Sequence, residues 1–123
     1  MKQEKFTELA QEALVSSQEL VHHYKHSQWD VEHILLALLQ QEKGLVGAIL
    51  EELSIPEGVI ITEIKNVMKK IPKAIFETGQ IYTTPRIAQL LQTANDEAER
   101  LKDEYISTEH LLVAITREDK SES

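Results

Sequence analysis

The segments DVEHILLALL (residues 30–39) and STEHLLVAI (residues 107–115) decide the fold of this chain. Each begins with a residue that favours the helix N-cap, Asp30 or Ser107, and continues as a nearly unbroken apolar run. Such a run makes a helix apolar around most of its circumference, which is typical of a buried helix. Because the Glu-His pair recurs 77 positions later (110 − 33 = 77), the two segments indicate an internal repeat.

The same shift of 77 also aligns the amphipathic segments that precede the two buried helices. It places Thr7 on Thr84, and it places Trp29 on Ile106. Between these points the apolar residues recur at steps of three and four, as on one face of a helix. Caps, core positions and turns therefore agree in one register, which a chance match would not produce.

Two further helices are expected in the first half, at residues 45–53 and after Pro56, which suits a first helical turn. Residues 70–84 break the helical pattern and predict an ordered loop with a short extended stretch. We therefore expect one all-α domain over residues 1–123, a pseudo-twofold duplicated four-helix repeat. Repeat one spans about 6–71, a linker about 72–83, and repeat two about 84–123, where it is incomplete at its C-terminal end.

Composition excludes several classes of function. The formal net charge is −8, and nucleic-acid affinity rests on basic residues that neutralise phosphates, so we expect no nucleic-acid partner. No apolar run approaches the ~20 residues that span a bilayer, and residues 1–7 lack the apolar stretch of a secretory signal. We therefore expect no membrane partner and a cytoplasmic location. Cysteine is absent, which excludes disulfides and thiolate metal sites.

The paired motifs resemble the duplicated amino-terminal domain of the Clp family of AAA+ chaperones. The resemblance rests on V-E-H-I-L-L-A-L-L at residues 31–39, I-S-T-E-H-L-L-V-A-I at 106–115 and T-P-R-I at 84–87. It extends from residue 6 to about residue 118. Within the family, D-E-Y-I-S-T-E-H-L-L (103–112) and G-Q-I-Y-T-T-P-R (79–86) look most like the ClpB disaggregase.

This resemblance implies a module that captures unfolded or aggregated proteins, or adaptor proteins, for threading by an AAA+ ring. The parent protein is then expected to be a homohexameric ATPase. The 123 residues contain no G-x-x-x-x-G-K-[ST] loop that would cradle a nucleotide phosphate. We therefore expect no enzymatic activity, no catalytic residue and no cofactor in this chain.

The resemblance also implies a substrate-contacting surface that includes Thr7, Asp103 and Glu109. Glu32 is the repeat-related partner of Glu109, and Thr84 that of Thr7, so we expect all five residues to bind substrate. An alternative for the two glutamates is purely structural, because an acid in the first helical turn is favoured by the helix dipole.

Apolar residues in the linker are a further candidate site. Phe76, Ile81 and Tyr82 lie where a loop would ordinarily be polar, and we expect them to line a hydrophobic groove for peptide segments. The alternative is that they pack over the seam between the repeats. Trp29, by contrast, is expected in the core.

The histidines invite a catalytic or metal-binding interpretation that their spacing does not favour. His33 and His110 each follow a glutamate, but consecutive helical residues point about 100° apart. We expect both to be buried and hydrogen-bonded to backbone near the helix start. His22 and His26 lie four apart without an evident third ligand, so we expect them to be solvated and not to bind a metal.

Other functions stay open. A protease-linked ClpC or ClpA type would dock adaptors, and in the ClpC type the resemblance places the guanidinium of phosphoarginine-marked clients on Glu32 and Glu109. A small hydrolase using His and Glu, and a purely structural oligomerisation module, are alternatives from other classes. Because the counterpart of the third helix would begin near residue 121 (44 + 77), we expect Leu111, Leu112, Val113 and Ile115 to lack part of their cover and to leave an apolar patch. The fragment is then a monomer or weakly self-associating.

Overall fold

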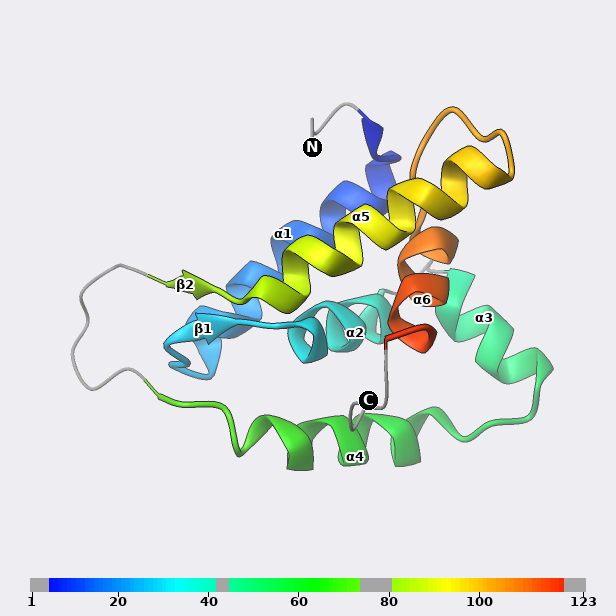
Figure 1. Cartoon of the computed structure of the whole chain (residues 1–123). Helices are drawn as coiled ribbons and strands as arrows, with labels where there is room; N and C mark the ends of the chain where they lie inside the picture. The colour runs from blue at the N-terminus through cyan, green and yellow to red at the C-terminus, as the bar shows by residue number, and fades with distance from the viewer. Residues whose placement is uncertain (1–4, 42–44, 74–80, 119–123) are drawn as a thin grey trace.

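The structure, a computed structural model, describes residues 5–41, 45–73 and 81–118. It is built mainly of helices, with one two-stranded pairing, which confirms the all-α prediction (Figure 1). The elements are α1 (Glu8–His23), β1 (Gln28–Trp29), α2 (Val31–Gln40), α3 (Leu45–Glu52), α4 (Glu57–Met68), β2 (Tyr82–Thr83), α5 (Pro85–Arg100) and α6 (Thr108–Thr116). None of these helices is long and apolar enough to cross a membrane.

The predicted register of 77 holds in the backbone. The bounds of α5 are those of α1 moved by 77 (8 + 77 = 85 and 23 + 77 = 100). Each of these helices is followed by a lysine with a left-handed backbone, Lys25 at φ 59° and Lys102 at φ 60°. The lysines are themselves 77 apart, so the turn that reverses the chain into the next helix is built in the same way in both repeats.

Helix starts follow from their capping residues. The Thr7 hydroxyl accepts a hydrogen bond from the Ala10 N–H at 3.2 Å, and an Asp30 carboxylate oxygen accepts one from the Val31 N–H at 2.8 Å. Both satisfy amides that the first turn of a helix leaves without a partner. Pro56 occupies the N-cap of α4 and so precedes the helix by one residue.

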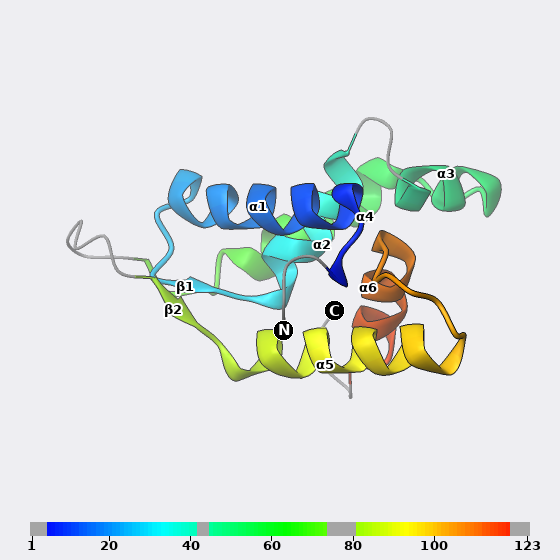
Figure 2. The same ribbon diagram turned by 90° about the horizontal axis from the view of Figure 1, so that it is seen from above.

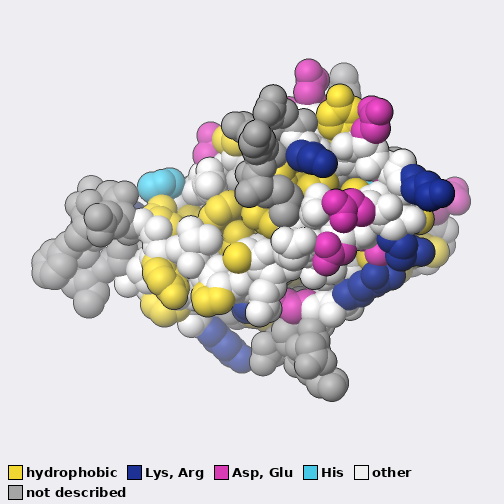
Figure 3. Space-filling model, turned by 45° about the horizontal axis from the view of Figure 1, so that its top comes forward, with side chains coloured by type: hydrophobic (Ala, Val, Ile, Leu, Met, Phe, Trp, Pro, Cys, Tyr) yellow, Lys and Arg dark blue, Asp and Glu magenta, His cyan; other side chains and the backbone are white. Residues whose placement is uncertain are grey.

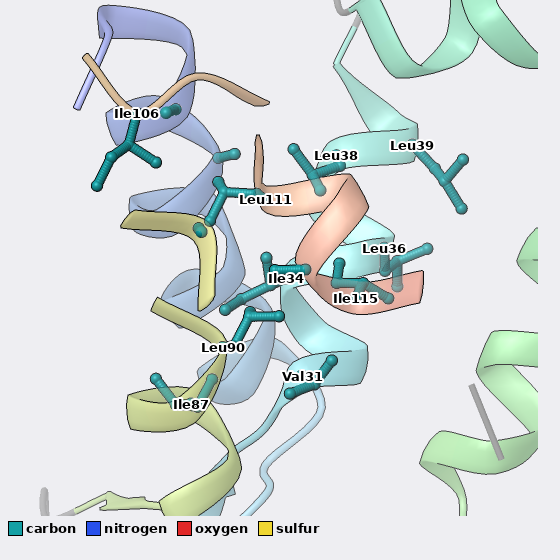
Figure 4. Packing of buried hydrophobic residues seen from close by; sticks show 14 of the residues in the cluster. Val31, Ile34, Leu36, Leu38, Leu39, Ile87, Leu90, Ile106, Leu111 and Ile115 are labelled. Carbon is teal, nitrogen blue, oxygen red and sulfur yellow. The ribbon is translucent and has the colours of Figure 1, made fainter. Parts of the chain in front are cut away.

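The core forms where α2 and α6 meet between α1 and α5, which Figure 2 shows on opposite sides of α2. Ile34 of α2, Leu90 of α5 and Leu111 of α6 point toward one another there (Figure 4), and each is at most 4% exposed. Leu111 and Ile115 belong to this core cluster and are buried, at 0% and 4% exposure. The expectation that these two residues lack cover was therefore wrong, while Leu112 and Val113 are half-buried.

Each repeat is joined to the other by backbone pairing. β1 and β2 pair in parallel, with Trp29 opposite Thr83, and Phe6 pairs in parallel with Ile106. These are equivalent contacts, since 29 + 77 = 106 and 6 + 77 = 83. The segment that leads into the first helix of one repeat thus lies along the turn of the other, and the extended stretch predicted in the linker is confirmed as β2.

Candidate functional site

A hollow of about 390 Å³ lies at the end of α5, and we call it the α5–α6 hollow. It is formed by the last turn of α5, the turn that follows and the first two turns of α6. Its lining residues are Glu97, Leu101, Asp103, Glu104, Tyr105, Ser107, Glu109, His110 and Val113. Its volume falls at the small end of the range for ligand pockets, which suits one or two side chains of a bound segment.

Two large apolar side chains of this hollow face solvent. Leu101 is 50% exposed and Tyr105 is 53% exposed. Leu101 caps the C-terminal end of α5, and the left-handed Lys102 then turns the chain away from the helix axis. The face in Figure 3 carries hydrophobic side chains over its middle and charged side chains of both signs toward the end where α5 finishes. The hollow therefore offers apolar contact next to charge.

A hydrogen-bonded histidine holds the turn of the α5–α6 hollow in place. The Ser107 N–H donates to Nδ1 of His110 at 2.8 Å, so the His110 proton is on Nε2. His110 Nε2 then donates to Oδ2 of Asp103 at 2.9 Å. The imidazole is buried, while the Asp103 side chain is 50% exposed. One face of this carboxylate is thus tied to His110, and the rest is open to a bound donor.

Two acids of the hollow differ sharply in environment. Glu109 is exposed in the first turn of α6. Glu97, at 4% exposure, accepts hydrogen bonds from Arg100 and, at 2.7 Å, from Arg117. Hydrogen bonding to Arg100 is the main reason why the pKa of Glu97 lies below its usual value. Glu97 is therefore neutralised within the protein, whereas Glu109, like Asp103 and Glu104, is exposed and open to a ligand.

The predicted trio of Thr7, Asp103 and Glu109 is brought to one end of the molecule. Asp103 and Glu109 line the same hollow, and the Thr7 N–H donates to the Ile106 carbonyl at 3.0 Å within the turn that bears Tyr105. The Thr7 hydroxyl is occupied in capping α1. Its placement next to the hollow supports the grouping, and its capping bond gives it a structural role as well.

The other predicted pair, Glu32 and Thr84, lies in a buried ionic cluster. The Thr84 hydroxyl donates to Oδ1 of Asp30 at 3.0 Å, and Nη1 of Arg86 donates to Oε1 of Glu32 at 3.2 Å. Arg86 Nη1 also donates to Asp30, while its Nε donates to Glu118 at 2.6 Å. Glu32 is only 4% exposed. It therefore holds a guanidinium of its own chain.

The pKa values in this cluster follow from burial and pairing. Burial is the largest effect on Glu32 and raises its pKa, against the opposing influence of its own backbone N–H and of Arg86. The pKa of Arg86 is raised, mainly by its hydrogen bonds to Glu118.

Arg86 was not identified from the sequence, where nothing in its spacing signals a contact with residues more than fifty positions away.

The linker candidates lie elsewhere. Phe76 is outside the described residues. Ile81 is half-buried and lines a small hollow of about 200 Å³ with Trp29, whereas Tyr82 is 62% exposed. Both precede α5, whose 16 residues extend about 24 Å, so they are separated from the α5–α6 hollow by the length of that helix. The structure thus does not combine the linker and the trio into one groove.

Histidine predictions have a mixed outcome. His33 and His110 are buried with Nδ1 accepting a backbone N–H, at 3.0 Å from Asp30 in the case of His33, which confirms the expectation. His22 is exposed as expected, but His26 is only 4% exposed and bonded to His33, so the expectation that it is solvated was wrong. Within the three described ranges, no three His, Asp or Glu side chains are grouped to hold a metal ion.

Two residues of the α5–α6 hollow were not identified from the sequence. Neither Leu101 nor Tyr105 is among the residues that the sequence analysis expects to bind substrate. The sequence does contain a signal for Tyr105, because the shift of 77 pairs it with the polar Gln28. An apolar residue at a position where the other repeat is polar is not needed for the shared core and indicates a contact residue.

Comparisons with known proteins place these features in a family. The Clp repeat (R) N-terminal domain matches residues 5–123. The chaperone protein ClpB of Bacillus anthracis is 36% identical over 115 residues, covering 91% of this chain and 13% of that protein. The ATP-dependent Clp protease ATP-binding subunit ClpC of Staphylococcus aureus is 32% identical over 116 residues, covering 94% of this chain and 14% of that protein. The chain thus spans about one seventh of the length of these relatives.

Solved structures share the fold at lower identity. The Hsp104 N-terminal domain from Candida albicans has a TM-score of 0.83 at 22% identity, with 92% of this chain and 74% of that chain covered. The ClpV N-domain, in a structure described as its complex with a VipB peptide, has a TM-score of 0.75 at 20% identity, with 98% and 73% covered.

Proposed function

The chain belongs to the Clp repeat N-terminal domain family, and from this premise we propose that it captures segments of unfolded or aggregated protein for a Clp-type AAA+ chaperone. The observation that carries the proposal is the α5–α6 hollow, where the half-exposed Leu101 and Tyr105 lie beside the acids Asp103 and Glu109. Unfolded proteins share little except exposed apolar side chains and free backbone N–H groups. An apolar contact rimmed by acceptors suits both.

Each element of the hollow has a distinct task in this proposal. Leu101 and Tyr105 bury an apolar side chain of the client, and removal of that surface from water supplies most of the affinity. Asp103 and Glu109 accept hydrogen bonds from client N–H groups or basic side chains. The bond from His110 to Asp103 orients that carboxylate in advance, which lowers the entropy lost on binding.

A disaggregase role is the finer form of the proposal. ClpB relatives support it, and so does the Arg86–Glu32 contact, because a ClpC-type site for phosphoarginine would need Glu32 to accept an external guanidinium. Adaptor proteins are a second class of partner, in keeping with the neighbouring ClpV N-domain that is described in complex with a peptide.

Weak binding suits a module that must release its client. A single hollow of this size is expected to bind at about −4 to −7 kcal/mol, which corresponds to dissociation constants from about 1 mM down to ~10 µM. In a homohexameric parent, six tethered copies would raise the avidity by orders of magnitude without any new contact. ATP hydrolysis would come from other parts of that parent, and this chain would supply no catalytic residue.

The proposal is tested by titrating the 123-residue chain with reduced, carboxymethylated lactalbumin as an unfolded probe and following amide NMR shifts. Shifts are expected around Leu101, Tyr105 and Glu109. Tyr105→Ser should weaken binding about tenfold, which equals ~1.4 kcal/mol, the scale of an aromatic anchor. Its matched control is Tyr82→Ser, since Tyr82 is also more than half exposed, at 62% against 53% for Tyr105, but lies outside the hollow.

Two outcomes would contradict the proposal. One is equal loss of affinity in both tyrosine variants, which would mean that the probe adheres to any exposed aromatic. The other is loss only in Tyr82→Ser, which would move the site to the linker. A Glu109→Gln variant that binds normally would remove the acid from the site but leave the apolar contact in place.

A further inference from the structure

A second hollow, of about 590 Å³, lies on the outer side of repeat one between α1 and the end of α2. Leu9, which is 37% exposed, and the half-buried Leu20 supply its apolar surface, and Glu12 and Glu19 supply its charge. An adjoining hollow of about 410 Å³ shares Glu12 and adds Val15, which is 49% exposed. We call the two together the α1–α2 groove.

The equivalent surface of repeat two is closed by ion pairs. The shift of 77 aligns Leu20 with Glu97 and His23 with Arg100. Glu97 binds Arg100 and also Arg117, whose counterpart in repeat one is a glutamine. The guanidinium of Arg117, at the end of α6, therefore bridges to Glu97 of α5, whereas α1 and α2 are left with a hollow between them. Arg100 pairs with Glu97 within α5.

The second ion-pair bridge of repeat two has only an uncharged counterpart in repeat one. Leu9 becomes Arg86 and Gln41 becomes Glu118 under the same shift, and Nε of Arg86 donates to Glu118 at 2.6 Å. In repeat one the corresponding contact is a hydrogen bond from Nε2 of Gln41 to the Leu9 carbonyl at 2.9 Å. The remaining amide oxygen of Gln41, Oε1, is buried and accepts no hydrogen bond from the described residues.

Among the described residues, no Lys or Arg side chain lines the α1–α2 groove, and His23 is its one basic residue. All three arginines of the chain are in repeat two, and residues 8–40 hold five acids against one lysine. Within the described part of the chain, no Lys, Arg or His side chain forms an ion pair with Glu8, Glu12 or Glu19. The groove thus combines exposed apolar surface with uncompensated negative charge along one helix.

We propose that the α1–α2 groove docks a basic amphipathic helical segment of a partner protein. Its leucines contact Leu9, Val15 and Leu20, and its cations pair with Glu12 and Glu19, as the chain's own arginines pair with acids on the equivalent face of repeat two. Glu12 and Glu19 are seven residues apart, or about 10 Å along α1. Cations at positions i and i+7 of a helical partner match that spacing.

This surface is separate from the α5–α6 hollow, so the inference does not depend on the proposed function. A partner held on α1 would leave Tyr105 and Glu109 open to a client. The groove therefore gives the domain a place for a regulatory or tethering protein that does not compete with client capture.

The test uses a synthetic helical peptide with leucines on one face and lysines at i and i+7, titrated into the 123-residue chain at low salt. Amide NMR shifts are expected along α1 and near Gln41. The double variant Glu12→Gln/Glu19→Gln should weaken binding at least tenfold. Raising the ionic strength from about 20 to 300 mM should weaken wild-type binding to a similar extent, because the charges are exposed.

The matched control is Glu63→Gln/Glu99→Gln, which removes two exposed acids of α4 and α5 and the same net charge. Unchanged binding in this control supports the proposal, and an equal loss overturns it, because the peptide would then respond to net charge alone. Shifts confined to the surroundings of Tyr105 also overturn it, since the peptide would then be a ligand of the α5–α6 hollow. A Tyr105→Ser variant that keeps full affinity separates the two surfaces.

Discussion

The side chains of His26 and His33 form a buried hydrogen bond, with 2.8 Å between Nδ1 of His26 and Nε2 of His33. The Asp30 N–H donates to Nδ1 of His33, so His33 carries its proton on Nε2 and donates it to His26. Both imidazoles are therefore neutral in this arrangement. In repeat two the equivalent of His26 is Asp103, which receives the same bond from His110.

This histidine pair predicts a loss of stability in mild acid. Burial, aided by the neighbouring His26, lowers the pKa of His33 to about 4, and burial with the charge of Lys73 lowers that of His26. In the unfolded chain both titrate near 6.5. Between pH 6.5 and 4 the unfolded state thus binds more protons, and the free energy of unfolding falls as the pH falls.

The contribution of His33 to this loss is roughly 3 kcal/mol between pH 7 and pH 4. Thermal unfolding followed by circular dichroism across that range measures it. His33→Gln should show a shallower dependence than the wild type, and His22→Gln, at an exposed histidine of α1, should match the wild type. A wild-type curve as shallow as that of His33→Gln would contradict the prediction.

Replacing His26 by aspartate should reverse the direction in which the pKa of His33 is shifted. In His26→Asp a carboxylate would accept the bond from His33 Nε2, as Asp103 does from His110, and would stabilise the imidazolium. We expect the pKa of His33 to rise above 6.5 in an NMR titration and the loss of stability between pH 6.5 and 4 to disappear. A His33 pKa that stays near 4 would show that burial, and not the partner, controls it.

Removing the guanidinium of Arg86 should destabilise the fold. Arg86→Met leaves Glu32 and Asp30, which are 4% and 7% exposed, without their cation. The expected loss is roughly 2–3 kcal/mol in urea unfolding, below the 3–5 of a fully buried pair because the Arg86 side chain is 31% exposed. Adding Glu32→Gln should recover part of the lost stability. If the two substitutions instead change the free energy of unfolding additively, the two residues are not coupled.

Thr7 should affect stability as well as binding. The sequence analysis expects Thr7 to bind substrate, but its hydroxyl also caps α1. Thr7→Ala should therefore cost about 1 kcal/mol, while Thr7→Ser keeps the cap and should cost little. Comparing both variants in thermal unfolding and in the unfolded-probe titration separates the two roles. If binding falls in Thr7→Ala after allowance for unfolding and not in Thr7→Ser, the hydroxyl also contributes to the site.

Local and repeated features of the fold could be predicted from the sequence. The caps at Asp30 and Ser107, the register of 77 and the burial of His33 all follow from patterns within a few residues or from comparison of the two halves. The trio of Thr7, Asp103 and Glu109 came from a family resemblance, and the structure adds that its members lie together.

Contacts between distant segments could not be predicted in this way. Arg86 reaches Glu32 across 54 positions, and no periodicity encodes that distance. The exposure of Leu101 depends on where α5 stops, since its spacing alone assigns it to the core stripe. His26 was expected in solvent because no third metal ligand was evident beside it and His22, yet the chain at Lys73 pairs with it and it is buried.

The reciprocal pairing of Phe6 with Ile106 and Trp29 with Thr83 bears on how the domain comes apart. The Thr7 N–H donates to the Ile106 carbonyl and the Thr84 N–H donates to the Trp29 carbonyl, so each repeat donates one hydrogen bond to the other. The first helix of either repeat therefore cannot detach without breaking a hydrogen bond to the other repeat. Unfolding should accordingly be one cooperative event, in which hydrogen exchange at these two amides reports the same opening free energy. A stretching force applied to one repeat would then also load the hydrogen bonds of the other, so the domain would resist mechanical unfolding as a single unit.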